Sequence, residues 1–341
     1  MGKNVQKKIR EAQSRPCRPL TPRASVTKLL GRPRLLVVGC GDVGLRLLPL
    51  LTRRYRVFAL TRQALDSSSA DMIRATQAIP IQGDLDQPQS LHKLGHLAQH
   101  VIHLAPPPNS GSHDPRTQHL LSHLGQGKSG KAYNVTILSC TAKTRQQRLI
   151  YISTSGVYGD CGGAKIDETQ PVNPQTARAV RRVAAERLIR SFGKRVRHHT
   201  HWQTAILRVP GIYANNRLPI ARLQAGTPAL NPDEDVYTNH IHADDLARLC
   251  RAALWHAKSQ RIYHASDNSE LKMGDYFDLV ATAFNLPKPP RVTRAELEKF
   301  VNPQLLSFMS ESRRLDNQRI KKELRTKLVY PLISNQSGGF K

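Results

Sequence analysis

A short aliphatic run that ends in three spaced glycines constrains the fold of this chain more than any other feature. Residues 35–38 have the composition of a buried parallel strand, and the pattern Gly39-x-Gly41-x-x-Gly44 follows them directly. Apolar residues then recur at helical spacing, at Val43, Leu47, Leu48 and Leu51. In such a turn the first glycine permits the bend, the second lets the backbone approach a pyrophosphate, and the third lets helix and strand pack closely. The order of these elements predicts a dinucleotide-binding unit, with an ordinary turn between strand and helix as the alternative.

The start of the predicted helix supplies the phosphate-binding groups. Backbone N–H groups in the first turn of a helix are unpaired and carry a partial positive charge, which favours phosphate. We therefore expect the cofactor to contact Gly39, Gly41, Asp42, Val43 and Gly44. Pro49 argues against this interpretation, because a proline inside a helix removes a hydrogen bond and costs about 3 kcal/mol.

Strand-like and helix-like segments alternate through much of the chain. Strands are predicted at residues 35–38, 56–60, 78–81, 100–104, 149–153 and 204–207, with an extra one at 134–138. This alternation predicts an α/β fold, a Rossmann-type doubly wound parallel sheet whose ligand lies at the carboxyl ends of the strands. We divide the chain into a basic, disordered arm (1–33), an NAD(P)-binding Rossmann domain (34–210), and a smaller C-terminal substrate lobe (211–334) interleaved with that domain.

The chain is strongly basic, with a formal net charge of +27 over 341 residues. Residues 1–34 carry ten Lys and Arg against one acid, so most of the excess lies outside the arm. A basic surface can bind nucleic acid, but no basic helix with interleaved aromatic residues and no RNA-binding motif accompanies the charge. A nucleic-acid partner is therefore not expected, and a small-molecule partner is.

Hydropathy and cysteine usage narrow the class of protein further. No apolar run approaches the roughly 18 residues that span a bilayer, so no membrane partner is expected. The five cysteines lack CxxC spacing, which indicates reduced thiols in the cytoplasm and no zinc site. An organellar transit peptide in the arm and a homodimer both stay open.

The end of the second predicted strand indicates which dinucleotide binds. An acidic residue there, about 20 residues after the glycines, would bind the ribose 2′-OH of NAD. This chain has Arg62 instead, whose guanidinium suits the 2′-phosphate of NADP. NADP is therefore the preferred cofactor, with NAD as the alternative. Asp84 and Leu85 after the third strand and Ala105 after the fourth complete the predicted cofactor site.

Several blocks further along the chain resemble one enzyme family. Residues 152–160 (ISTSGVYGD) are similar to the active-site strand of the extended short-chain dehydrogenase/reductases, the NAD(P)-dependent epimerase/dehydratase family. Residues 207–213 (LRVPGIY) and 239–247 (NHIHADDLA) resemble later blocks of the same family. The resemblance covers residues 34–331, and it implies the Rossmann fold, a nicotinamide cofactor and a small carbonyl or sugar-like substrate.

By the same resemblance, this chain differs from the family at the positions of the catalytic residues. The family uses a tyrosine and a lysine four residues apart on one helix face, and Arg178 and Arg182 occupy these positions here. A guanidinium stays protonated, so Arg178 cannot transfer a proton, whereas Arg182 can still hold the nicotinamide ribose. The resemblance aligns Thr154 with the residue that hydrogen-bonds the reacting oxygen. Tyr158 is the nearby phenol that could replace the missing acid, with simple lining of the pocket as its alternative.

Two arginines at this spacing repel one another unless an anion lies between them. Arg178 and Arg182 therefore either bind a cofactor phosphate or an acidic substrate, or point into solvent. Near the C-terminus, Arg313 and Arg314 either cover the substrate mouth or begin an exposed helix.

The segment after the sixth predicted strand contains the expected substrate residues, Tyr213, Asn216 and Arg217. Further on, His240 and His242 with two following aspartates could ligate a metal. The family resemblance explains that block as a strand that enters a helix, so no metal is expected.

Two functions stay open from the sequence. The first is an NAD(P)-dependent oxidoreductase or epimerase-like enzyme that lacks the usual Tyr-x-x-x-Lys pair, with Thr154 and Tyr158 as its catalytic residues. The second is a catalytically inactive NADP-binding sensor or regulatory protein. The preserved Thr154 favours the enzyme, whereas the missing pair favours the sensor.

Overall fold

The computed structural model describes residues 31–95, 97–125, 147–194, 196–197, 200–301, 306–307 and 309–333. The described residues from Arg34 onward form one compact unit. The strand expected at 134–138 and all but the last three residues of the expected arm lie outside the described residues.

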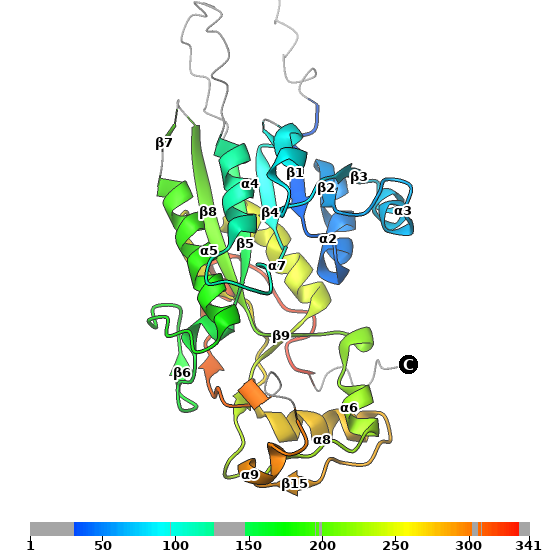
Figure 1. Ribbon diagram of the computed structural model, residues 1–341, viewed down its shortest axis with the longest axis vertical. Helices are drawn as coiled ribbons and strands as arrows, with labels where there is room; N and C mark the ends of the chain where they lie inside the picture. The colour runs from blue at the N-terminus through cyan, green and yellow to red at the C-terminus, as the bar shows by residue number, and fades with distance from the viewer. Residues whose placement is uncertain are drawn as a thin grey trace, which may run out of the picture. The chain divides into compact units, whose positions relative to one another are not determined.

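A parallel sheet forms the centre of this unit and confirms the predicted fold class. Its strand order is β13-β8-β5-β4-β1-β2-β3, and β7 pairs with β8 at one side (Figure 1). The strands span β1 Arg34–Val38, β2 Arg56–Thr61, β3 Ile79–Gln82, β4 His100–His103, β5 Gln147–Thr154, β7 Val196–Arg197, β8 Thr200–Val209 and β13 Arg261–His264. All pairs along the main path are parallel, and only β7 with β8 is antiparallel among the described residues of this sheet.

Alternate residues of the central strands point to opposite faces of the sheet, and each face has its own hydrophobic cluster. On one face, Leu35 and Val37 pack with apolar residues of α2 (Asp42–Thr52), α3 (Ser68–Ala75) and α7 (Ala243–His256). On the other face, Leu36 and Val38 pack with η2 (Pro88–Leu94), α4 (Pro115–Gly125) and α5 (Ala177–Lys194). Burial on both faces is the reason these strands are continuously aliphatic.

Pro49 lies within α2, on its exposed side, and the helix continues to Thr52. The argument against a helix after the glycines was therefore wrong. On the exposed side, solvent can satisfy the carbonyl group that loses its partner.

A second set of elements lies beyond the carboxyl ends of the strands (Figure 1). Apolar side chains of α6 (Ile220–Gln224) and α8 (Met273–Ala283) form its core with Tyr213. The shorter elements are η3 Ser155–Tyr158, β6 Lys165–Ile166, β9 Gly211–Tyr213, η4 Asn215–Arg217, β10 Ala229–Leu230, β11 Tyr237–Thr238, β12 His240–His242, β14 Leu271–Lys272, β15 Arg291–Val292, α9 Arg294–Leu297, β16 Arg314–Leu315 and α11 Gln318–Glu323. Within the expected lobe at 211–334, α7 and β13 return to the central sheet, so the chain alternates between the two layers.

No helix in the part of the chain that the structure describes is long and apolar enough to cross a bilayer.

A buried ion pair joins α5 to β8. The Arg208 Nη2 lies 2.7 Å from Glu186 Oε2, and the two side chains are 3% and 5% exposed. The guanidinium also lies over the Tyr158 ring, 4.7 Å from its centroid. Removing one partner of such a pair leaves a buried charge without compensation.

We therefore expect Glu186→Gln to lower the free energy of unfolding by about 3–5 kcal/mol, measured by urea titration. Asp71→Asn breaks the exposed Arg74–Asp71 pair and serves as the control, with an expected loss of about 0.5 kcal/mol. Equal losses in the two variants would contradict this view of the buried pair.

Candidate functional site

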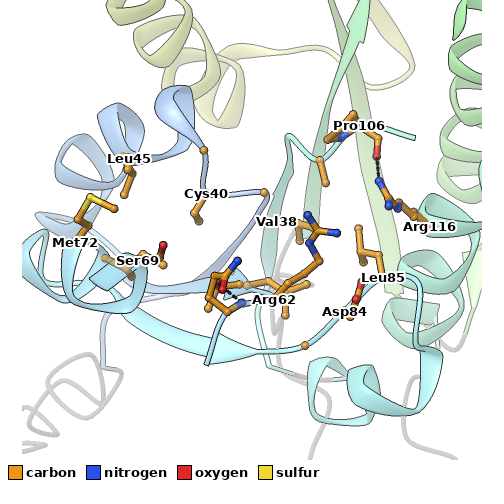
Figure 2. A pocket seen from close by; sticks show the side chains of 18 residues that line it. Val38, Cys40, Leu45, Arg62, Ser69, Met72, Asp84, Leu85, Pro106 and Arg116 are labelled. Atoms are coloured by element: carbon orange, nitrogen blue, oxygen red, sulfur yellow. Dashed lines mark hydrogen bonds between the residues drawn. The ribbon is translucent and has the colours of Figure 1, made fainter. Parts of the chain in front are cut away.

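The carboxyl ends of the central strands lie at one level, where they form a cavity of about 380 Å³. Val38 of β1 is paired with Leu60 of β2 and with His103 of β4, so the segments that follow these strands meet at one edge. Most of the predicted cofactor residues line this cavity: Gly39, Gly41, Arg62, Asp84, Leu85 and Ala105. In Figure 2, Arg62 points into it between Ser69 and Met72 on one side and Leu85 and Arg116 on the other.

The glycines of the loop serve different purposes. Gly39 has φ +94°, and a Cβ there would lie 2.6 Å from the Ala105 backbone nitrogen. A Cβ on Gly44 would lie 2.8 Å from the Gly39 carbonyl oxygen. These two glycines are therefore required by the fold itself.

Gly41 is different, because its backbone is extended (φ −75°, ψ −161°) and a Cβ there would meet nothing within 4 Å. It precedes α2, and no side chain caps the N–H groups of the first turn, which includes Asp42 and Val43. Open space beside uncapped N–H groups suits a diphosphate. The residues present therefore fit a dinucleotide. Burial raises the pKa of the neighbouring Cys40 thiol to about 12, so no thiolate charge opposes phosphate there.

Two arginines, Arg62 and Arg116, and one acid, Asp84, line the part of the cavity where the adenosine is predicted to bind. Arg62 follows β2, where no acid is present, and Arg116 binds Asp86 in an ion pair of 2.6 Å. The pKa of Asp86 is lowered chiefly by its hydrogen bond from Arg116 and further by the nearby charge of Arg62. Asp84 accepts a hydrogen bond from the Asp86 backbone, which holds the turn after β3.

The expected substrate residues, Tyr213, Asn216 and Arg217, do not line this cavity. Asn216 and Arg217 lie against the glycine loop and its helix. Arg46 of α2 contacts Asp42, Asp244 and Asn216, and Arg217 lies 3.5 Å from Asp42. The expected roles of Asn216 and Arg217 in substrate binding stay predictions, and their observed neighbours belong to the predicted diphosphate site.

Tyr213, also expected to bind substrate, is 1% exposed and packs edge-on against His240 and His242. His240 lies against Tyr276, and His242 accepts a hydrogen bond from the Asp244 backbone as the cap of α7. Within the described ranges, no group of three or more His, Cys, Asp or Glu residues could hold a metal ion.

The two candidate catalytic residues have different surroundings. Thr154 ends β5, is partly exposed, and accepts a hydrogen bond from Gly156 N. Tyr158 is 1% exposed, and its hydroxyl is hydrogen-bonded to His264 Nε2. Burial lowers the pKa of His264 to about 4, so the ring is neutral, and its Nδ1 donates to the Asp316 carbonyl oxygen. His264 Nε2 is therefore the acceptor, and the Tyr158 hydroxyl donates its hydrogen bond to this nitrogen. Burial also raises the pKa of Tyr158 to about 12.

A second cavity, of about 490 Å³, adjoins the first along the loop after β4. It is lined by Pro106, Pro107, Pro108, Asn109, Thr176, Arg178, Arg181, Arg182 and Ser307. Pro106 lines both cavities. Arg178 and Arg182, predicted from the family resemblance to occupy the tyrosine and lysine positions, therefore line a cavity next to the predicted cofactor site. Arg182 Nη1 donates to the Tyr151 hydroxyl and the Ile152 carbonyl oxygen, which places it under the end of β5.

Sequence reasoning missed Glu311. Its Oε2 and the Thr154 Oγ1 both lie within 4 Å of the point that a Cβ on Gly156 would occupy. Glu311 is bonded to Arg313, which is 9% exposed and also donates to the Gly159 carbonyl oxygen. The exposed helix start suggested for Arg313 and Arg314 was wrong, because Arg313 is buried and Arg314 begins β16. No sequence motif marks Glu311, since only the return of this segment to η3 brings it near Thr154.

The chain is similar to known proteins both in its sequence and in its fold. The model of the NAD dependent epimerase/dehydratase family matches residues 35–266. The dTDP-D-glucose 4,6-dehydratase of Homo sapiens is 24% identical over 145 residues, which span 40% of this chain and 40% of that protein. A conserved protein of unknown function from Silicibacter pomeroyi has a TM-score of 0.70 at 25% identity, covering 90% of this chain and 98% of that chain. A UDP-glucuronic acid 4-epimerase from Bacillus cereus, solved in complex with NAD, has a TM-score of 0.65 at 18% identity, covering 90% and 96%.

The contrast between the glycines generates a prediction. Gly41→Ala should leave the free energy of unfolding within about 1 kcal/mol, since the backbone there suits alanine. The same change should weaken nicotinamide dinucleotide binding at least about tenfold, because the added methyl group occupies the diphosphate space. Fluorescence titration with NADPH and NADH measures the affinity.

Gly44→Ala is the matched comparison. Its Cβ has no room beside the Gly39 carbonyl oxygen, so it should lower stability by about 1–3 kcal/mol. Unchanged dinucleotide affinity in a folded Gly41→Ala protein would refute the diphosphate site.

Proposed function

Because the chain belongs to the NAD dependent epimerase/dehydratase family, we propose that it is an oxidoreductase or epimerase-like enzyme acting on a small carbonyl or sugar-like substrate. The observation that carries the proposal is the pair of adjoining cavities that share Pro106. The first has the glycine loop and Arg62, and suits the adenosine and diphosphate of a dinucleotide. The second has the arginines in the positions of the family's catalytic pair, and suits the nicotinamide end and the substrate.

Solved relatives support a sugar-like substrate. The B. cereus protein is a UDP-glucuronic acid 4-epimerase, and another neighbour of the same fold, MoeE5, was solved in complex with UDP-glucose and NAD. The cytoplasmic location and the homodimer stay predictions.

NADP preference is part of the proposal. The family is NAD dependent, and the ordinary NAD signal is an acid at the end of the second strand. Here Arg62 points into the cavity at that place, across from Arg116, whose charge is paired with Asp86 (Figure 2). A guanidinium forms paired hydrogen bonds with phosphate, so the 2′-phosphate of NADP fits better than a free ribose hydroxyl.

Arg62→Gln should therefore reduce NADPH affinity about tenfold or more and leave NADH affinity nearly unchanged. Arg53→Gln is the control. Arg53 is exposed and follows the end of α2 that is remote from the glycine loop, so this change should alter neither affinity. Parallel losses for NADPH and NADH in Arg62→Gln would count against the preference.

Proton transfer needs a group other than Arg178. A bound nicotinamide ring would supply hydride chemistry, and the chain must hold the reacting oxygen and move its proton. We propose that Thr154, at the end of β5, hydrogen-bonds that oxygen. Tyr158 donates its proton to His264, whereas Glu311 is a carboxylate that accepts from Arg313 through Oε2 and lies, like the Thr154 hydroxyl, within 4 Å of a Cβ built on Gly156. We assign proton exchange to Glu311 ahead of Tyr158.

Three variants test these assignments on a panel of aldehydes, ketones and nucleotide sugars. Thr154→Ala should lower kcat about 10²- to 10³-fold, and Glu311→Gln about 10²-fold or more. Tyr158→Phe should change kcat less than about tenfold if its hydroxyl serves only the His264 contact. Exposed controls are Thr282→Ala and Glu298→Gln.

A larger loss of kcat in Tyr158→Phe than in Glu311→Gln would assign proton exchange to the Tyr158 hydroxyl instead. Tight dinucleotide binding without turnover of any substrate on the panel would favour the non-catalytic sensor instead.

A further inference from the structure

Three arginines of α5 face the second cavity, and no Asp or Glu lines it among the residues that the structure describes. Arg178, Arg181 and Arg182 lie on the first turns of the helix, opposite the loop of Pro106–Pro108 and Asn109. Partial desolvation lowers the pKa of Arg178, the Glu311 carboxylate raises it, and Arg182 and Arg181 lower it. The guanidinium groups are therefore close enough to repel one another.

Neutral oxygens hold two of these arginines in place. Arg182 donates to a phenol and a carbonyl oxygen, at 3.0 and 2.8 Å. Arg181 donates to the Gly111 carbonyl oxygen at 2.9 Å. Such contacts orient a guanidinium without cancelling its charge. Glu311, the acid whose charge acts on Arg178, is itself paired with Arg313 at 2.8 Å.

Arg181 adds a second observation. Its side chain lines the cavity although the residue is only 7% exposed. Its Nε is buried and has no hydrogen-bond partner among the described residues. The described residues therefore leave part of the donor capacity of this guanidinium unused, beside a cavity with no acid in its described lining.

We propose that the arginines of α5 form an anion site that binds a carboxylate or phosphate group of the substrate, next to the reacting end of the cofactor cavity. This inference rests on the proposed function and narrows its substrate class to acidic molecules. Guanidinium groups bind both anions through paired hydrogen bonds. A cavity of about 490 Å³ is within the range of small-molecule sites. Arg178 then has a binding role at the position where the family has its proton donor.

Isothermal titration of the full chain at constant ionic strength tests the site. The probes are glucuronate, glucose 6-phosphate and glucose, which share a ring and differ in a carboxylate, a phosphate or neither. NADP+ affinity is measured first, and each probe is then titrated into the free protein and into protein saturated with NADP+. Both anionic probes, or one of them, should bind at least about tenfold more tightly than glucose.

Arg178→Gln should weaken binding of the preferred probe about tenfold or more, and Arg178→Lys, which keeps the charge but loses the paired donors, should weaken it less. Arg187→Gln, an exposed change on the same helix, should have no effect. Thermal unfolding confirms that each variant is folded.

The outcomes separate the two proposals. Absence of NADP+ binding would remove the proposed function. Normal NADP+ binding with equal affinities for glucose and both anions would overturn the anion site alone. Anion binding that disappears on saturation with NADP+ would assign the arginines to a cofactor phosphate and also overturn the inference. Equal losses in Arg178→Gln and Arg187→Gln would show a general charge effect in place of a site.

Discussion

The close approach of two backbone segments, at Gly39 after β1 and Ala105 after β4, is the constraint on which the rest of the site depends. There is no room for a side chain between them, because a Cβ on Gly39 would lie 2.6 Å from the Ala105 nitrogen. The turn can therefore bend at once into α2 and direct the uncapped N–H groups of that helix along the carboxyl edge of the sheet. Both cavities open along this edge, and the loop that begins at Ala105 separates them.

Arginines serve two physical purposes in this strongly basic chain. Several arginines that hold the fold are paired with carboxylates, as in Arg208 with Glu186 inside the unit and Arg46 with Asp42 and Asp244 beside the glycine loop. Arg181 and Arg182, which line the second cavity, donate to neutral oxygens instead. A carboxylate partner neutralises the charge of an arginine, whereas neutral partners leave that charge available to a ligand.

The sequence predicted the central sheet well. The expected strands match β1, β2, β3, β4, β5 and β8 within a few residues, because a strand buried on both faces must be aliphatic along its whole length. The family resemblance was confirmed, and the glycine loop, Arg62 and Asp84 do line one cavity. β13 was not expected as part of this sheet, since its position depends on a pairing with β8 that is distant in the chain.

Local patterns by themselves determined the βα unit and the layered α/β fold, because both depend on neighbouring residues along the chain. Only the tertiary structure decided that Tyr158 turns inward to His264, that Asn216 and Arg217 lie by the glycine loop, and that Glu311 lies near Thr154. These contacts join segments far apart in the sequence. Side-chain direction and long-range packing set them, and neither leaves a periodic signal in the order of residues.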